Sequence, residues 1–103
     1  MKYLRLFESF EDIDKICRKY YINYTINKDG SIDANYVNLC NEKLTKLPLK
    51  FNRVDGYFDC SWNKLTTLEG SPVEVNSSFF CNNNNLTSFE FAPKIIRGDF
   101  DCR

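Results

Sequence analysis

A short motif recurs in this chain at a fixed step of 21 residues, and this step constrains the fold more than any other feature. The motif reads Phe-x-Cys-x-x-Asn-x-Leu, with copies that begin at Phe58 and Phe79 and a truncated copy that begins at Phe100. One step upstream, residues 37–44 keep the same spacing with Val, Leu, Glu and Leu in the four positions. A unit of this length cannot bury an apolar face alone, so such units stack side by side and form a solenoid.

The motif also predicts the secondary structure of each unit. Residues two apart in a strand face the same side, so Phe58 and Cys60 should point inward together. Prolines and Gly70 between the motifs argue against helical returns, which we expect to be extended or short 3₁₀ segments. We therefore predict an α+β, mostly β protein, in which a short solenoid of parallel strands spans residues 35–103 as three units plus a fourth strand.

Residues 1–34 contain no copy of the motif, and we predict that they form an N-terminal cap made of a helix and a β-hairpin. Within residues 9–20, apolar side chains recur three and four positions apart, and Ser9 with Asp12 resembles a capping box at the helix start. Alternating apolar residues over 22–34, interrupted by an Asp-Gly pair, predict the hairpin. A solenoid needs a cap because its first unit would otherwise expose its core. A separate recognition module is the alternative interpretation.

Three of the five cysteines, Cys60, Cys81 and Cys102, follow the repeat step. Leu39 holds the same position in the first unit, so these thiols should act as small hydrophobic side chains. A straight row of sulfurs cannot surround a tetrahedral zinc ion, and the chain has no C-x-x-C pair. We predict buried free thiols rather than a metal site or disulfides. Cys40 is offset by one residue, and it is the cysteine that we would test for reactivity.

The composition argues against an enzyme. The chain has no histidine, which removes the usual general base and the commonest zinc ligand. Its 14 basic and 14 acidic residues balance, so no overall field draws it to nucleic acid or to an anionic membrane. We expect no catalytic residue, no cofactor, no metal and no membrane contact. The chain lacks both an apolar run of about 18 residues and the features of a secretory signal, which predicts a cytoplasmic location.

The repeats resemble leucine-rich repeats, whose pattern is L-x-L-x-x-N-x-L, once Phe and Cys are allowed at the leucine positions. The resemblance is to short bacterial or phage-type members, and it covers about two thirds of the chain. It implies a right-handed coil of parallel strands with an asparagine ladder, in which the side chains of Asn63 and Asn84 bond to neighbouring backbone groups. Glu42 takes the ladder position in the first unit. A carboxylate only accepts hydrogen bonds, so this departure leaves the local turn in doubt.

Residues 1–10 are similar to the N-terminal tags found on many proteins of large tailed phages. A phage-encoded protein would act in the cytoplasm of the host cell. The alternative is that this apolar stretch packs beside the helix of the cap.

The side chains between the inward-pointing positions should face outward on the concave sheet of the solenoid. Aromatic side chains anchor protein interfaces, and neighbouring carboxylates favour a basic partner and repel phosphate. The alternative is that these are ordinary exposed aromatic residues, since much of any protein surface is apolar. The candidate partner-binding residues are Tyr36, Tyr57, Asp59, Trp62, Phe80 and Asp101.

We therefore expect a non-enzymatic protein-binding module, and within that class a phage-encoded inhibitor of a host defence protein. One alternative is a structural subunit that stacks or forms a homodimer through its uncapped Phe100 strand, unless the chain is a fragment of a longer array. Another is a nucleoprotein or RNA-binding protein. That alternative would use Tyr20, Tyr21 and Tyr24 together with the basic group Lys43, Lys46, Lys50 and Arg53.

Overall fold

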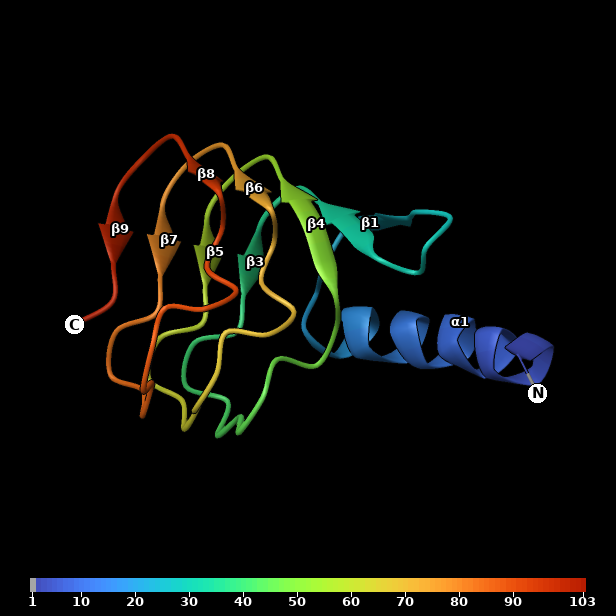
Figure 1. Cartoon of the computed structure of the whole chain (residues 1–103). Helices are drawn as coiled ribbons and strands as arrows, with labels where there is room; N and C mark the ends of the chain where they lie inside the picture. The colour runs from blue at the N-terminus through green and yellow to red at the C-terminus, as the bar shows by residue number, and fades with distance from the viewer. Residues whose placement is uncertain (1) are drawn as a thin grey trace.

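The computed structural model describes the backbone of residues 2–103 and the side chains of residues 10–103. One helix, α1 (Lys2–Lys19), precedes a series of short strands (Figure 1). The strands are β1 (Tyr24–Ile26), β2 (Ile32–Ala34), β3 (Val37–Asn38), β4 (Phe51–Val54), β5 (Phe58–Asp59), β6 (Glu74–Val75), β7 (Phe79–Phe80), β8 (Ile95–Ile96) and β9 (Phe100–Asp101).

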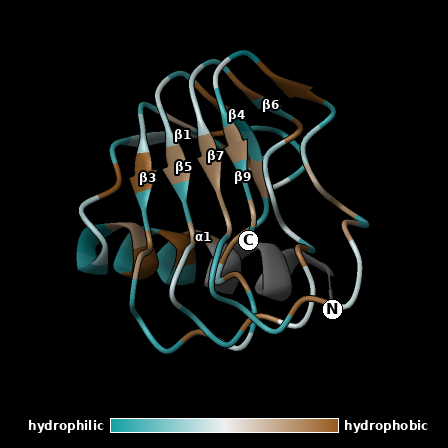
Figure 2. Ribbon diagram, turned by 90° about the vertical axis from the view of Figure 1, so that its left-hand side faces the viewer, coloured by the Kyte–Doolittle hydropathy of each residue, from teal (hydrophilic) through white to brown (hydrophobic). Residues whose placement is uncertain are grey.

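The strands form two sheets that run along the molecule. Sheet A has five strands in the order β1-β2-β4-β6-β8, and sheet B has four in the order β3-β5-β7-β9. Every neighbouring pair is parallel except β1 and β2. Phe58 pairs with Phe79, and Phe79 with Phe100, so each turn of the coil takes 21 residues. The chain is a β-solenoid of about three turns, and the predicted parallel stacking at the repeat step is confirmed (Figure 2).

The segments that return from one sheet-B strand to the next contain the strands of sheet A. Val54 pairs with Val75, and Val75 with Ile96, in the same parallel register as sheet B. The returns are extended, which is one of the two forms that the proline and glycine positions predict.

An asparagine ladder made by Asn63 and Asn84 bridges the turns that follow β3, β5 and β7. Asn63 Oδ1 accepts hydrogen bonds from the backbone N–H groups of Glu42 and Leu44, at 2.9 and 3.0 Å. Its Nδ2 donates to the carbonyl oxygens of Leu39 and Cys60, at 2.8 and 3.0 Å. One amide therefore bridges two turns with both its donor and its acceptor, a task that a carboxylate cannot perform. In the first turn, Glu42 holds the ladder position and its side chain is exposed. The bridge is supplied there by Asn63 of the next turn.

At the N-terminal end, the hairpin extends sheet A. β1 pairs antiparallel with β2, and β2 then pairs parallel with β4. The turn between β1 and β2 uses Gly30 at φ 86°, and the Asp29 carboxylate accepts a hydrogen bond from the Ser31 N–H at 2.9 Å. The hairpin thus supplies β1 and β2, the first two strands of sheet A.

Helix α1 begins at Lys2, earlier than the predicted start at residue 9. The capping-box interpretation of Ser9 is wrong, because the helix passes through this residue. The prediction that residues 1–10 pack beside the helix is wrong for the same reason, since the helix includes them from Lys2 onward. The side chains before Phe10 lie outside the described residues.

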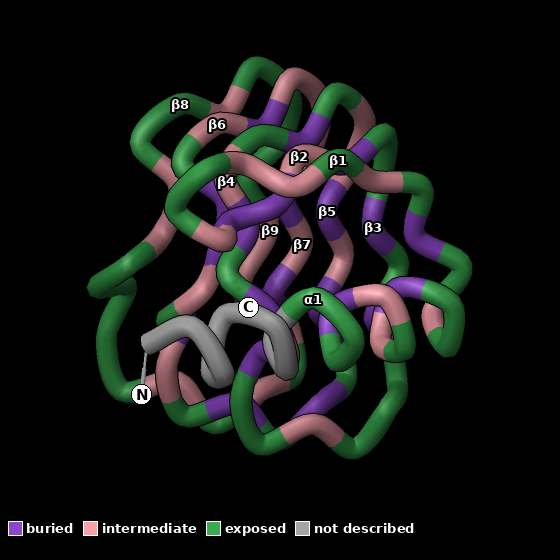
Figure 3. Tube along the Cα trace, turned by 90° about the vertical axis from the view of Figure 1, so that its right-hand side faces the viewer, coloured by how far each residue is buried: buried purple, intermediate pink, exposed green. Residues whose placement is uncertain are grey.

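The helix ends in a Schellman motif. The Ile22 N–H donates to the Cys17 carbonyl at 2.8 Å, and the Tyr21 N–H donates to the Arg18 carbonyl at 3.4 Å. Tyr21 takes the left-handed position at φ 57°, where glycine is the usual residue. This end of α1 meets the first turn of the solenoid (Figures 1 and 3). Ile13 of α1 belongs to the core cluster.

The core lies between the two sheets and runs along the solenoid axis (Figure 3). Phe51, Phe58 and Phe79 are almost completely buried. The rings of Phe58 and Phe79 stack at 5.4 Å between centroids, and Phe51 meets Phe58 edge-on at 5.0 Å. Each such ring contributes about 2–3 kcal/mol through burial. The inward positions of the motif therefore form a continuous aromatic column.

Candidate protein-binding face

The outward residues of sheet B form rows that cross all its strands. Phe58 and Phe79 point into the core, so the next residues in each strand point to the other side. One row places Asp59 next to Phe80 and Phe80 next to Asp101, in the register of the parallel strands. All three side chains are half-buried. We call this outward surface, with the residues that flank it in each strand segment, the candidate face.

A second row lies one step before each strand of sheet B. Tyr36 and Tyr57 are neighbours in it, with ring centroids 5.4 Å apart and the planes tilted by 32°. Tyr36 is 48% exposed and Tyr57 is half-buried. Burial raises the pKa of the Tyr57 hydroxyl, and the neighbouring Tyr36 and Asp59 raise it further. Tyr57 is therefore a neutral hydroxyl at physiological pH that can donate a hydrogen bond to a partner.

Trp62 lies where the chain turns away from β5. It is 59% exposed and adopts φ 56°. The equivalent residues one turn before and one turn after are Asn41 and Asn83, at φ 57° and 59°. Asparagine tolerates this left-handed conformation, whereas a large aromatic residue rarely adopts it. The turn therefore holds an exposed indole at a position where the neighbouring turns hold asparagine.

The candidate face carries more negative than positive charge. Arg103 donates two hydrogen bonds to Asp101, each at 3.1 Å, and this lowers the pKa of the Asp101 carboxyl. Asp59 accepts hydrogen bonds from the backbone N–H and the hydroxyl of Ser61. Among the described side chains, Asp59 and Asp99 make no ion pair with a basic residue. A basic partner would therefore meet two carboxylates whose charge is not offset.

A groove of about 610 Å³ separates the end of α1 from the first strands of sheet B. Tyr36 and Tyr57 line it together with Tyr21 and Glu42, neither of which is among the six predicted partner-binding residues. Tyr21 is 87% exposed. The Tyr-Tyr pair directly after the helix is the sequence signal for this wall, but only the fold shows that it faces the other tyrosines.

The structure thus brings five of the six predicted residues onto one surface. Tyr36 and Tyr57 form a pair, and the other three form the row across β5, β7 and β9. Trp62 lies beyond the end of β5, at the edge of this surface. The spacing of these groups is set by the strand spacing of the solenoid.

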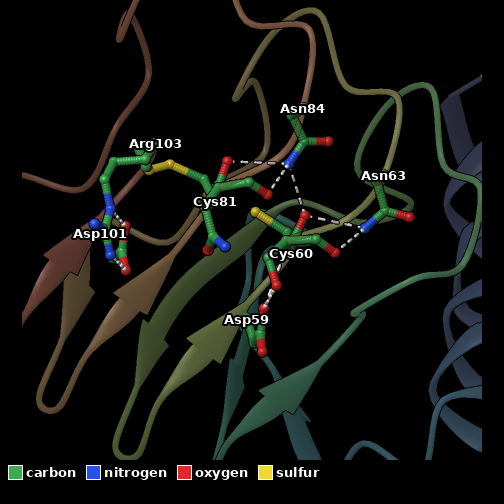
Figure 4. The surroundings of a disulfide bond; sticks show 10 residues. Asp59, Cys60, Asn63, Cys81, Asn84, Asp101 and Arg103 are labelled. Atoms are coloured by element: carbon green, nitrogen blue, oxygen red, sulfur yellow. Dashed lines mark hydrogen bonds and ion pairs between the residues drawn. A yellow bond between two sulfur atoms is a disulfide. The ribbon is translucent and has the colours of Figure 1, made fainter.

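The cysteine row contains a disulfide. Cys81 and Cys102 are joined, with a Cα–Cα distance of 4.4 Å (Figure 4). The prediction of free thiols is wrong for this pair. Parallel stacking brings equivalent residues of adjacent turns within the Cα–Cα range of a disulfide. A row of cysteines that cannot surround a zinc ion can therefore still form a disulfide between two adjacent turns.

The remaining cysteines are free in the structure. Burial raises the pKa of Cys60 to about 12 and that of Cys17 to about 11, so both are unreactive thiols. Cys40 is partly exposed, and its Sγ lies 3.6 Å from the oxygen of the Ser61 hydroxyl, whose hydrogen is donated to Asp59. Its reactivity stays a prediction.

The residues of the RNA-binding alternative have internal partners in several cases. The Tyr24 hydroxyl donates to Asp14 at 2.8 Å, which raises the pKa of Tyr24 to about 12. Lys50 pairs with Asp29 at 3.5 Å, and Arg53 pairs with Asp55 at 3.2 Å. These exposed pairs reduce the positive charge that the basic group presents to a phosphate.

No group of three potential metal ligands from histidine, cysteine, aspartate or glutamate comes together among the described residues. No helix in this part of the chain is long and apolar enough to cross a membrane. In comparisons with known proteins, no family model, no curated protein and no solved structure matches this chain.

Proposed function

We propose that this chain is a non-enzymatic protein-binding module that acts through the candidate face. The observation that supports this most strongly is the row of Asp59, Phe80 and Asp101, held in parallel register on the outside of sheet B. Phe80 makes up the middle of this row, although the core lies on the other side of the sheet. An outward aromatic residue between two carboxylates suits a partner surface with basic and apolar side chains.

The solenoid supports this function through its rigidity. Each strand of the candidate face is fixed by hydrogen bonds to its neighbours, so the aromatic side chains are presented at set spacings before a partner arrives. Binding to a preorganised surface avoids the entropic cost of ordering loops. Tyr36, Tyr57 and Trp62 add aromatic groups of the kind that dominate interface energies.

We also propose the finer assignments that the sequence favours. The repeats are divergent leucine-rich repeats, supported by the asparagine ladder at Asn63 and Asn84. The similarity of residues 1–10 to phage N-terminal tags supports a phage-encoded inhibitor of a host defence protein, acting in the cytoplasm of the host cell, where reducing thiols would open the Cys81–Cys102 disulfide. The small size and the balanced charge are compatible with such an inhibitor.

A pull-down from a bacterial lysate tests the candidate face. The double variant Tyr57→Ala/Phe80→Ala should lose the captured protein, because it removes two aromatic anchors from the face. The matched control is Phe10→Ala, which removes an exposed aromatic residue from α1, outside sheet B. Equal capture by the wild type and the double variant would remove the candidate face from consideration.

Assembly through the last turn is the second candidate function. Phe89 and Phe100 are 56% and 48% exposed, and their rings pack edge-on at 5.6 Å. A second molecule that pairs with β9 would cover both rings. Light scattering over tens of micromolar protein distinguishes the two functions, because assembly predicts a mass that rises with concentration. A constant monomer mass would count against it.

A further inference from the structure

A second groove, of about 720 Å³, lies outside sheet B and shares no residue with the candidate face. Three consecutive return segments form it, and they lead into β4, β6 and β8 of sheet A. The segments are 46–51, 69–73 and 91–94. The groove therefore crosses the stacked turns.

Gly70 allows two of the three segments to approach each other closely. Leu49, Gly70 and Phe91 occupy the same position in successive turns. Gly70 adopts φ +96°, and a Cβ atom there would lie 2.6 Å from the carbonyl oxygen of Leu49. The second segment therefore packs directly against the first, and no side chain projects from its middle between Leu49 and Phe91.

The lining of the groove is mainly apolar and partly accessible. Val73 is 46% exposed and Phe91 is 50% exposed, whereas Pro48 is half-buried and Leu47 is buried. Phe91 holds its exposed ring at φ 71°, a conformation that a phenylalanine rarely adopts. Concave sites of this volume with apolar and aromatic linings and a few polar groups are typical of small-molecule sites.

The charges at the rim are mostly positive. Lys46, Lys50 and Lys94 line the groove, against one acidic residue, Glu69. Lys50 is paired with Asp29 at 3.5 Å. Among the described side chains, Lys46 and Lys94 make no ion pair, and they come from the first and the third of the segments that line the groove. An anionic group at the rim would be complementary to these two ammonium groups.

We propose that this groove binds a single-chain amphiphile with an anionic headgroup, such as a medium-chain fatty acid. The alkyl chain lies along Pro48, Val73 and Phe91, and the carboxylate contacts Lys46 and Lys94 at the rim. This site is independent of the proposed protein-binding face, because the two surfaces have no residue in common. Failure of either proposal leaves the other in place.

An NMR titration of the ¹⁵N-labelled protein with decanoate, below its micelle-forming concentration, tests the proposal. Saturable amide shifts should be confined to residues 46–51, 69–73 and 91–94. The variant Lys46→Glu/Lys94→Glu should bind decanoate about tenfold more weakly or worse, because two attractive charges become repulsive. The matched control Lys43→Glu/Lys64→Glu changes two exposed lysines that do not line the groove, and it should bind as the wild type does.

Three results would overturn the proposal. One is the absence of saturable shifts in the groove. Another is equal affinity for octanoate and for 1-octanol, which differ in the charged headgroup. The third is tighter binding, at the same amides, of a ten-residue peptide of alternating glutamate and leucine, which would assign the groove to an acidic protein segment. If the glutamate variant loses its dispersed spectrum, Lys46→Gln/Lys94→Gln serves instead, with a smaller loss of affinity expected.

Discussion

The middle turns of the solenoid and its last turn use the same residue at the same position, yet the environments differ. Phe58 and Phe79 are 0% exposed, whereas Phe100, the next residue in the same column, is 48% exposed. Phe100 still packs edge-on against Phe79, with 5.8 Å between centroids. A phenylalanine of this column is therefore buried when a turn of the coil packs on each side of it, and the residue type alone does not bury it.

The first turn obtains that second neighbour from outside the repeats. The core cluster that contains β3 and β4 also includes Ile13 and Cys17 of α1 and buried residues of the β1–β2 hairpin. In the described structure, the last turn has the preceding turn as its packing partner. Side chains of the column in the middle turns therefore stabilise the coil, whereas those in the last turn remain available for contact with another molecule.

The largest expected effect is a difference between two alanine substitutions in the aromatic column. Phe58→Ala should lower the free energy of unfolding by about 4 kcal/mol, because it removes a fully buried ring and leaves a cavity. Phe100→Ala should cost about 1 kcal/mol, since half of its ring is already in water. Urea unfolding followed by circular dichroism measures both, with Phe79→Ala as the control that should match Phe58→Ala. Equal losses at positions 58 and 100 would show that something covers the last turn in solution.

The next effect concerns the disulfide, which fastens the last turn to the one before it. Cys81–Cys102 closes a loop with a sequence separation of 21 residues, so Cys102→Ser should destabilise the oxidised protein by about 3 kcal/mol. The control is Cys40→Ser, which changes a partly exposed free cysteine and should have little effect. Denaturant unfolding with and without a dithiol reductant measures the difference. Titration of thiols in the denatured, unreduced chain should find 3 free groups; finding all 5 would exclude the disulfide.

A smaller effect separates the two asparagines of the ladder. Asn63 is 8% exposed and joins two turns that are both covered, whereas Asn84 is half-buried in the outer part of the coil. Asn63→Ala should cost about 3 kcal/mol and Asn84→Ala about 2 kcal/mol, because backbone groups lose their partners in a drier site at residue 63. Unfolding free energies of the two variants measure this order. A larger loss at Asn84 would contradict the view that the outer turn is the weaker one.

Much of the coil could be predicted from the sequence because the repeat step sets the register directly. Once Phe58, Phe79 and Phe100 are aligned, their inward direction and the outward direction of Asp59, Phe80 and Asp101 follow from strand alternation. The return segments were limited to extended or 3₁₀ forms by their prolines and Gly70. The elements that follow a period are thus the ones that sequence reasoning placed well.

The features that were missed depend on contacts between turns or on the N-terminal segment. The start of α1 at Lys2 could not be separated from the false capping signal at Ser9, since both positions lie in a helix-compatible stretch. The Cys81–Cys102 bond requires the distance between adjacent turns, which spacing along the chain does not give. The groove at the end of α1 requires the path of the helix relative to sheet B, so Tyr21 could be assigned to it only from the structure.

The smallest expected effect tests whether Trp62 is kept for binding at a cost in stability. Trp62→Asn should raise the free energy of unfolding by about 1 kcal/mol, because asparagine tolerates the left-handed backbone that tryptophan holds there. The reverse exchange one turn later, Asn83→Trp, should lower it by a similar amount. Capture of the partner should fall for Trp62→Asn and stay unchanged for Asn83→Trp, if the indole at the edge of the candidate face contacts the partner. A Trp62→Asn variant that is less stable than the wild type would mean that the indole packs on its own turn, and its exposure would then have no bearing on recognition.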